Sequence, residues 1–219
     1  KGVFLVVDNT WATPLYLNPL DLGADVSIHA GTKYLCGHSD VMVGTATAKG
    51  RAWDLLSRAS FTAGQTISAD DAFLTLRGIR TLDVRLRQHG AQALHIAKWI
   101  EANPAVARVL HPALKSCPGH DIWQRDFKGS TGLFSVILKG GTEPDCAAMV
   151  DHLEHFKMGF SWGGYESLIL PADPTSIRTA TKWQAEGPLL RVHIGLENID
   201  DLMADLDAGL ARYTAAISA

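Results

Sequence analysis

One apolar run near the start of the chain constrains the fold more than any other feature. The segment "GVFLVVD" (residues 2–8) is continuously apolar until it reaches Asp8. A short unbroken run of this kind predicts a strand covered on both faces, as in the parallel sheet of an α/β protein. Residues 24–31 ("ADVSIHAG") and 41–48 ("VMVGTATA") are further strand candidates, bounded by Asn, Gly, Pro or Asp. The beginning of the chain therefore predicts part of a parallel-sheet α/β domain.

The pattern changes from strands to helices at Ser68. Ser68 is a suitable N-cap, and Asp71 stands at the third helical position. Apolar side chains then recur at helical spacing until Asn103-Pro104, which ends the run. The predicted apolar face comprises Phe73, Leu76, Leu82, Leu86, Ala93, Ala97 and Ile100.

Gly78 is expected to interrupt this helical stretch and to mark a domain boundary. We expect residues 1–78 to be the C-terminal part of a large domain and residues 79–219 to be a small C-terminal domain. The remaining elements predicted are strands at 132–141 and 189–197, a helix at 142–156 capped by Thr142, and an amphipathic helix at 198–213. Strands and helices thus alternate in the small domain as well.

Composition excludes several classes of protein. A net charge of −3 without a long basic run disfavours nucleic-acid binding. No apolar stretch reaches the roughly 18 residues that a membrane span needs. Three scattered cysteines without a Cys-x-x-Cys pair predict neither a disulfide framework nor a metal site, and favour a reducing, cytoplasmic location. The chain starts at Lys1 inside a predicted strand, so we expect an N-terminal part of the same protein to precede it.

An acid and an amine follow two of the predicted strands. Asp8 and Lys33 each come at a carboxyl end, the edge of an open parallel sheet where ligands bind. A lysine that forms a Schiff base and a carboxylate that keeps a pyridine nitrogen protonated are what pyridoxal 5′-phosphate requires. From these residues alone, a solvated Lys33 and a turn aspartate in Asp-Asn-Thr stay open as the alternative.

The segment "VVDNTWATPLYLNPLDLGADVSIHAGTKYLCGHSDVMVG" closely resembles the cofactor-lysine region of the Cys/Met-metabolism family of pyridoxal-phosphate enzymes. The resemblance implies the aspartate-aminotransferase-like fold (fold type I), with pyridoxal 5′-phosphate bound as a Schiff base on Lys33. It implies that Asp8 holds the ring nitrogen and that Thr32 binds the phosphate. The family commonly has a serine where this chain has Ala30, so one phosphate contact is replaced or lost.

Ser161 lies in a segment with two interpretations. Gly159-Phe160-Ser161-Trp162-Gly163 matches the Gly-x-Ser-x-Gly pattern of serine hydrolases, which would be completed by Asp173 and His193. The order of predicted elements, helix before and strand after, disfavours that nucleophile turn. The segment "SWGGYESL" resembles the β-lyase branch of the Cys/Met-metabolism family. That resemblance implies that Ser161 and Trp162 seat the substrate carboxylate and that Ser161 approaches Lys33.

Arg191 lies in the predicted strand "LLRVHIGLE" on the face that it shares with His193. Its planar guanidinium can bind a carboxylate through two hydrogen bonds, or it can form a structural ion pair. The family resemblance implies the first role, with the α-carboxylate of an amino acid as the ligand. His152 and His155 beside Glu154 lack a third ligand and are expected on a solvated helix face.

The resemblance implies a carbon–sulfur lyase that converts L-cystathionine into homocysteine, pyruvate and ammonia by β-elimination, in methionine biosynthesis. A γ-lyase or a cystathionine γ-synthase of the same family is the alternative, and a serine hydrolase using Ser161 is a more distant one. The resemblance also implies a homotetramer built from active dimers. Within each dimer, neighbouring subunits complete the sites.

Overall fold

Two sheets organise the part of the chain that the structure, a computed structural model, describes, residues 2–218. The first sheet has the order β1-β2-β3, and the second has the order β4-β5-β8-β7-β6. The strands are β1 (Val6–Asp8), β2 (Val26–Ala30), β3 (Gly44–Ala48), β4 (Val106–Leu110), β5 (Leu133–Leu138), β6 (Lys157–Met158), β7 (Leu168–Ala172) and β8 (Leu189–His193). The helices are α1 (Thr13–Tyr16), α2 (Gly50–Thr62), α3 (Ala69–Arg80), α4 (Leu82–Glu101), α5 (His120–Asp126), α6 (Glu143–Val150) and α7 (Ile199–Ile217).

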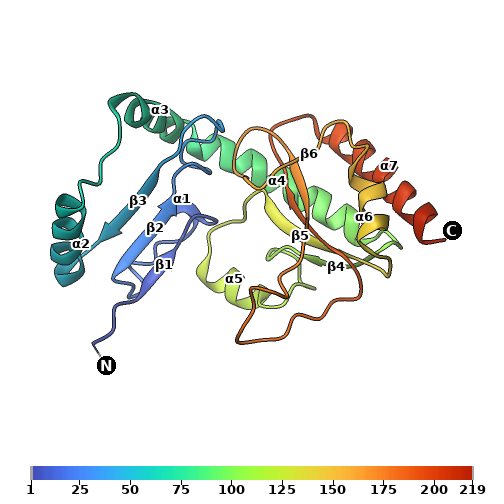
Figure 1. Cartoon of the computed structure of the whole chain (residues 1–219), viewed down its shortest axis with the longest axis horizontal. Helices are drawn as coiled ribbons and strands as arrows, with labels where there is room; N and C mark the ends of the chain where they lie inside the picture. Colours follow the sequence, from blue (N-terminus) through green and yellow to red (C-terminus); the bar gives the residue numbers. More distant parts are fainter. Residues whose placement is uncertain (1, 219) are drawn as a thin grey trace.

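The two sheets lie side by side, each with its own helices (Figure 1). The first sheet and helices α1 to α3 form one half of the molecule, and the second sheet with α5, α6 and α7 forms the other. The long helix α4 extends from the first half into the second. No helix within residues 2–218 is both long enough and apolar enough to cross a membrane.

The first sheet differs from the sequence prediction in two ways. β1 pairs with β2 in parallel, with Asp8 opposite Ile28, but β3 runs antiparallel to β2. The connection from β2 to β3 starts with a tight turn and contains no helix, so the chain reverses direction instead of crossing over. The apolar run is also not covered on both faces: Val3 and Val6 are exposed, because no described element packs over them. Lys1 lies outside the described residues.

The helical stretch begins as predicted but is divided differently. Ser68 caps α3 by accepting a hydrogen bond from the Asp71 N–H at 3.0 Å. Gly78 does not interrupt the helix, which continues to Arg80 before the break at Thr81. A Cβ at Gly78 would lie 2.3 Å from the carbonyl oxygen of Cys36, so this glycine permits close packing against the chain that follows β2. Phe73 and Leu76 of the predicted apolar face are exposed, and the other five members are buried.

The second sheet holds the main hydrophobic core. The predicted strands in residues 132–141 and 189–197 are present as β5 and β8, which pair antiparallel. Their buried face packs against α4, α6 and α7 through Ala93, Ile96, Ile100, Val136, Leu138, Met149, Leu190, Val192, Leu202, Leu206, Leu210 and Tyr213. Burial of a contiguous apolar surface of this kind is the main favourable contribution to folding.

Helix α6 is shorter than predicted because a buried carboxylate binds the chain that follows it. Thr142 caps α6 as expected, but the helix ends at Val150. Asp205, on α7, accepts hydrogen bonds from the backbone N–H groups of Glu154, His155 and Phe156 at 2.9, 2.8 and 3.1 Å. These N–H groups point to Asp205 and not back along a helix, so residues 151–156 form a turn.

The role of Asp205 leads to a prediction about stability. Asp205→Ala leaves three N–H groups without their acceptor, one of them buried and two part-buried, and each such loss costs on the order of 1 kcal/mol. We expect the free energy of unfolding to fall by roughly 3 kcal/mol. Urea denaturation of the protein, expressed at the full length of its relatives, measures this change. Asp207→Ala, an exposed position on the same helix, is the control and should change stability by less than about 0.5 kcal/mol. Equal effects of the two substitutions would contradict the assignment.

Candidate active site

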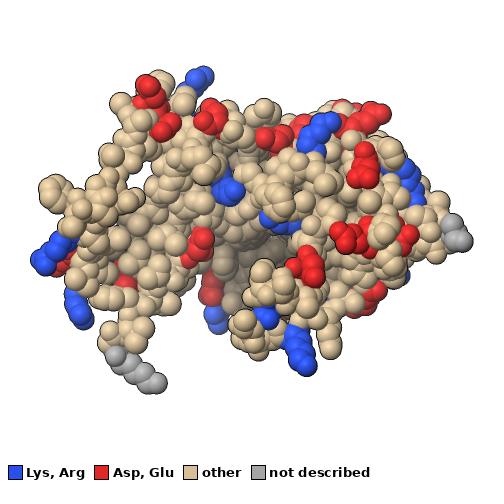
Figure 2. All heavy atoms as spheres, in the orientation of Figure 1, with Lys and Arg blue, Asp and Glu red and all other residues tan. Residues whose placement is uncertain are grey.

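Two parallel neighbouring strands place an acid and an amine at the same sheet edge. Asp8 is the last residue of β1, and Lys33 follows the end of β2 at Ala30. The parallel pairing of β1 with β2 makes these two strands neighbours. Within residues 2–218, no hydrogen bond or ion pair joins the two side chains directly. A hollow lies near the centre of the face shown in Figure 2, with Lys or Arg atoms at its upper side.

The Asp8 carboxylate is oriented by Thr10. Its Oδ1 accepts hydrogen bonds from the backbone N–H of Thr10 at 3.0 Å and from the Thr10 hydroxyl at 2.5 Å. The hydroxyl bond is the main cause that lowers the pKa of Asp8 below its usual value, so the group is ionised at neutral pH. The same hydroxyl accepts a hydrogen bond from the Ala30 N–H at 2.9 Å and so links β1 to the end of β2. Oδ2 makes no hydrogen bond with the described residues.

Thr10 was not identified from the sequence. The tripeptide Asp-Asn-Thr could have pointed to this residue. It is typical of a turn in which the aspartate side chain binds the backbone N–H of the residue two positions later. From the sequence alone, a turn aspartate and a ligand-binding aspartate are alternative roles for Asp8. The structure shows that the two descriptions are compatible, because the turn uses only one oxygen of the carboxylate.

The Lys33 amine is half-buried and faces the second half of the molecule. Its Nζ donates a hydrogen bond to the Ser161 Oγ at 3.0 Å and lies 5.5 Å from the centroid of the Trp162 ring. Burial lowers the pKa of Lys33, and the positive charge of Arg191 lowers it further. A lysine with a lowered pKa is a better nucleophile and base near neutral pH. The Lys33 amine is therefore only partly solvated.

Arg85 fixes the turn that carries Lys33. Arg85 as a whole is only 5% exposed. Its Nη2 donates to the carbonyl oxygens of Tyr34 at 2.9 Å and Gly78 at 2.8 Å. Tyr34, which is 1% exposed, accepts a hydrogen bond at its hydroxyl from the Gly132 N–H at 3.0 Å. No pattern in the sequence pointed to Arg85, because its partners are carbonyl groups that any residue carries.

Thr32 is engaged within its own turn. Its hydroxyl accepts a hydrogen bond from the Val43 N–H at 2.9 Å and lies 3.4 Å from the Val43 carbonyl oxygen. The hydroxyl proton is therefore held only by a long bond and is available to a phosphate oxygen. The Ala30 N–H, by contrast, is already bound to Thr10. This group cannot replace the family's serine while that bond is formed.

Arg191 lies on β8 beside the loop that carries Ser161. Its Nη2 donates to the carbonyl oxygens of Phe160 at 2.8 Å and Gly159 at 3.3 Å. The alternative of a structural ion pair is not supported: none of the ion pairs among residues 2–218 involves Arg191. Burial lowers the pKa of Arg191, although the guanidinium remains charged. The structure thus brings Lys33, Ser161, Trp162 and Arg191 together.

The serine hydrolase alternative is contradicted by the geometry. Ser161 is followed by bends and by strand β7, so the strand–turn–helix order of a nucleophile turn is missing. His193 Nε2 is bonded to the Gly163 N–H at 3.0 Å and not to Ser161. Asp173 binds the Thr175 N–H in its own loop. The three residues of the proposed triad do not form a hydrogen-bonded chain.

No group of metal-ligating side chains occurs within residues 2–218. His152 and His155, which were predicted on a helix, follow the end of α6 in a turn and are exposed.

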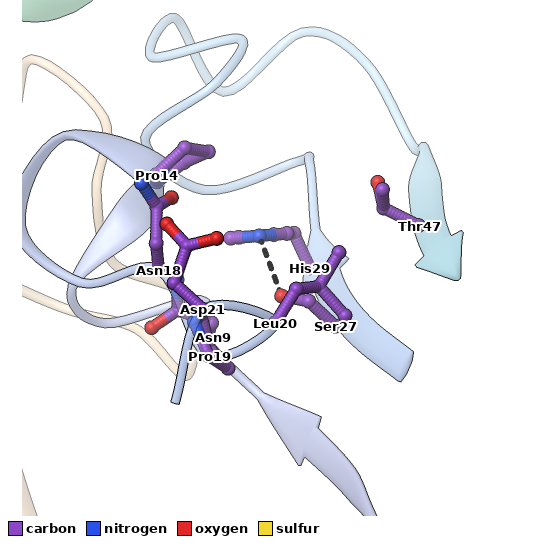
Figure 3. A pocket seen from close by; sticks show the side chains of 9 residues that line it. All are labelled: Asn9, Pro14, Asn18, Pro19, Leu20, Asp21, Ser27, His29 and Thr47. Atoms are coloured by element: carbon purple, nitrogen blue, oxygen red, sulfur yellow. Dashed lines mark hydrogen bonds between the residues drawn. The ribbon is translucent and has the colours of Figure 1, made fainter. Parts of the chain in front are cut away.

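A pocket of about 240 Å³ lies beside the first sheet but does not include Asp8 or Lys33. Figure 3 shows Ser27 and His29 of β2 lining it, with the Ser27 hydroxyl 3.4 Å from the His29 Nε2. Because side chains alternate along a strand, Ser27 and His29 face away from Ile28, the partner of Asp8. The pocket therefore belongs to the opposite face of the sheet from Asp8.

Comparison with known proteins places this geometry in context. The chain is 50% identical over 212 residues to the cystathionine beta-lyase MetC of Escherichia coli (strain K12), covering 95% of this chain and 54% of that protein. It is 44% identical over 214 residues to the L-alanine/L-glutamate racemase of Wolbachia pipientis wMel, covering 96% of this chain and 53% of that protein. The chain thus spans about half the length of the curated relatives it matches.

Solved structures agree with the sequence comparison. The crystal structure of cystathionine gamma synthase from Xanthomonas oryzae pv. oryzae in complex with aminoacrylate and cysteine matches with a TM-score of 0.88 and 43% identity, covering 98% of this chain and 57% of that one. This likeness confirms the predicted fold class, fold type I of the pyridoxal-phosphate enzymes. The family model for "Cys/Met metabolism PLP-dependent enzyme" matches residues 1–211, and with these relatives it shows that the chain belongs to that family.

Proposed function

We propose that this chain is part of a carbon–sulfur lyase that converts L-cystathionine and water into homocysteine, pyruvate and ammonia by β-elimination. The observation that carries the proposal is the half-buried Lys33 amine, which meets Ser161 at 3.0 Å beside the edge where Asp8 ends β1. The 50% identity to a relative named cystathionine beta-lyase supports β-elimination over the γ-lyase and γ-synthase alternatives.

The residues present fit pyridoxal 5′-phosphate, the cofactor of the family. Asp8 has an ionised carboxylate with Oδ2 free to hold a ring nitrogen, Lys33 supplies the amine, and Thr32 supplies a hydroxyl for the phosphate. When bound, the cofactor supplies an aldehyde for Schiff-base formation and a protonated ring that accepts electrons from the substrate α-carbon.

Lys33 is proposed to move the protons of the reaction. Its lowered pKa increases the fraction of neutral amine at neutral pH, and only the neutral amine can take the proton from the α-carbon. The same nitrogen can then return that proton to the departing sulfur atom of homocysteine. Ser161, which accepts a hydrogen bond from Nζ, keeps the amine on the side of the substrate.

Arg191 is proposed to bind the α-carboxylate of the substrate, with Ser161 and Trp162 seating the same group. Only Nη2 of Arg191 is bonded to the loop carbonyls, so Nε and Nη1 remain available for a carboxylate. A fixed carboxylate fixes the direction of the α-hydrogen relative to Lys33, which accelerates proton transfer through orientation.

The assembly and location of the protein are also proposals. We propose a homotetramer of active dimers in the cytoplasm, with an N-terminal part of the same protein completing each subunit. Val3, Leu5 and Val6 are exposed at the edge that includes β1. Neighbouring exposed apolar side chains of this kind support a partner segment or subunit that covers this edge. The free state of Cys36, Cys117 and Cys146 supports a reducing compartment. The domain boundary near residue 78 is retained as a proposal.

The first prediction of the proposed function concerns the covalent link to the cofactor. Lys33→Ala in the protein at the full length of its relatives should lose the visible band of the Schiff base in amine-free solution and at least about a thousandfold of activity, since general base and nucleophile are both removed. Absorption spectra and pyruvate release measure these two effects. Lys98→Ala, an exposed lysine on α4, should change neither. Retention of the visible band in Lys33→Ala would exclude Lys33 as the Schiff-base residue.

The second prediction concerns the bond that is cleaved. Incubation with L-cystathionine should release pyruvate and homocysteine, which are distinguished from 2-oxobutyrate and cysteine by mass spectrometry. Release of 2-oxobutyrate would assign the protein to the γ-cleaving alternative. Racemisation of L-alanine without cleavage of cystathionine would favour the activity named for the Wolbachia relative.

The third prediction concerns substrate binding. Arg191→Lys keeps the positive charge but loses the planar fork, so KM for L-cystathionine should rise roughly 10- to 100-fold while kcat changes less. Steady-state kinetics separates the two constants. Arg87→Lys, a position whose side chain is 67% exposed on α4, is the control and should leave both unchanged. An unchanged KM in Arg191→Lys would remove Arg191 from the carboxylate site.

A further inference from the structure

The polar face of β8 holds both ends of the loop that carries Ser161. At the beginning of the loop, Arg191 donates to the carbonyl oxygens of Gly159 and Phe160. At its end, the Gly163 N–H donates to the His193 Nε2 at 3.0 Å. Ser161 and Trp162, which contact Lys33, lie between these two points of attachment.

The hydrogen bond from Gly163 defines the state of His193. A backbone N–H can only donate, so Nε2 must be unprotonated and the ring neutral, with its proton on Nδ1. The Gly164 carbonyl oxygen, 3.3 Å from the same nitrogen, is then a close contact and not a hydrogen-bond acceptor. His193 is 1% exposed, and this burial lowers its pKa to about 3. His89, Arg191 and Lys33 act in the same direction, so the ring stays neutral at working pH.

The position of Gly163 determines how the loop meets the lysine. A Cβ at this residue would lie 2.9 Å from the Tyr34 nitrogen and 3.0 Å from the Lys33 carbonyl carbon, so the two backbones are in close contact. The φ angle of +81° also favours glycine at this position. The Trp162 ring next to it packs on Tyr34, with centroids 5.5 Å apart. A shift of Gly163 would therefore move both Ser161 and Trp162 relative to Lys33.

We propose that His193 is a positioning residue: by accepting the Gly163 N–H, it holds the loop 159–163 so that Ser161 meets the Lys33 amine. The effect on turnover rests on the lyase function proposed above, but the effect on Lys33 itself does not. A leucine could fill much of the same volume without accepting this hydrogen bond. The bond to Gly163 therefore distinguishes the proposal from simple core packing, in which any side chain of similar size would serve.

Three substitutions at position 193 separate acceptor chemistry from volume. His193→Gln can place an amide oxygen near the position of Nε2 and should retain the hydrogen bond. His193→Leu removes the acceptor. His193→Asn keeps a polar group but reaches only the position of Nδ1. It tests the loss of the acceptor if the leucine variant does not fold. Each is made in the protein expressed at the full length of its relatives.

The kinetic test uses the cofactor-loaded protein and a double-mutant cycle with Ser161→Ala. We expect kcat/KM for L-cystathionine to fall roughly 10- to 100-fold in His193→Leu or His193→Asn, and less than about 3-fold in His193→Gln. If His193 acts through the loop, its substitution should have a much smaller effect in the Ser161→Ala background. Equal effects in the two backgrounds, or equal losses in the glutamine and leucine variants, would overturn the proposal.

A second readout does not depend on the lyase activity. In the same proteins stripped of cofactor, the rate at which trinitrobenzenesulfonate modifies Lys33 is followed against pH by peptide mass spectrometry. Loosening of the loop exposes the amine, so its pKa should move up toward the ordinary value in His193→Leu and His193→Asn but not in His193→Gln. An unchanged midpoint in all three variants would overturn the proposal. If the parent protein does not cleave cystathionine, this measurement still decides the role of His193.

Discussion

The parallel pairing of β1 with β2 is the constraint on which the rest of the site depends. It places the ends of both strands at one edge, so that Asp8 and the turn carrying Lys33 lie next to each other. The Thr10 hydroxyl strengthens this arrangement because it binds the Asp8 carboxylate on one strand and the Ala30 N–H on the other. A slip by one residue would send Asp8 to the opposite face of the sheet and would break the bond between Ala30 and Thr10 that joins the two strands.

The second half of the molecule completes the surroundings of the lysine. Its main contribution is the loop 159–163, which is hydrogen-bonded to β8 and in close contact with the backbone of Lys33. The contact of Lys33 Nζ with Ser161 joins residues that are far apart in sequence, and it partly removes the amine from water. This desolvation is the main cause that lowers the lysine pKa, and the positive charge of Arg191 lowers it further. The reactivity of Lys33 therefore depends on how the two halves pack.

Sequence patterns predicted the helices and strands of this fold better than they predicted which other segments cover or end each of them. Periodicity identified α4, α7, β5 and β8, because each buries one face in the core of this chain. The start of α3 was identified from its Ser68 cap, although Phe73 and Leu76 of its predicted apolar face are exposed. The prediction that β1 is covered on both faces was wrong for residues 2–218, since burial depends on partners that a local pattern does not reveal. The end of α6 was also misplaced, because the carboxylate of Asp205 that binds the following turn comes from a distant helix.

In the candidate site, too, the residues that carry the chemistry were easier to predict than the residues that position them. Lys33, Asp8 and Arg191 could be predicted as site residues because their side chains carry the chemistry and the family resemblance marks their positions. Thr10, Arg85 and His193 were missed as supports because their partners are mainly backbone groups, which leave no pattern in the sequence.

Arg191 shows why such supports matter for function. One of its nitrogens holds the loop carbonyls, while the remaining N–H groups are available to a carboxylate. A lysine at this position has a single nitrogen, which would have to serve both partners. In the proposed function, the guanidinium can therefore bind a substrate without releasing the loop that carries Ser161. The proposal thus connects substrate binding and lysine positioning through one side chain on β8, and His193, two positions further along the same face, accepts a hydrogen bond from the other end of that loop.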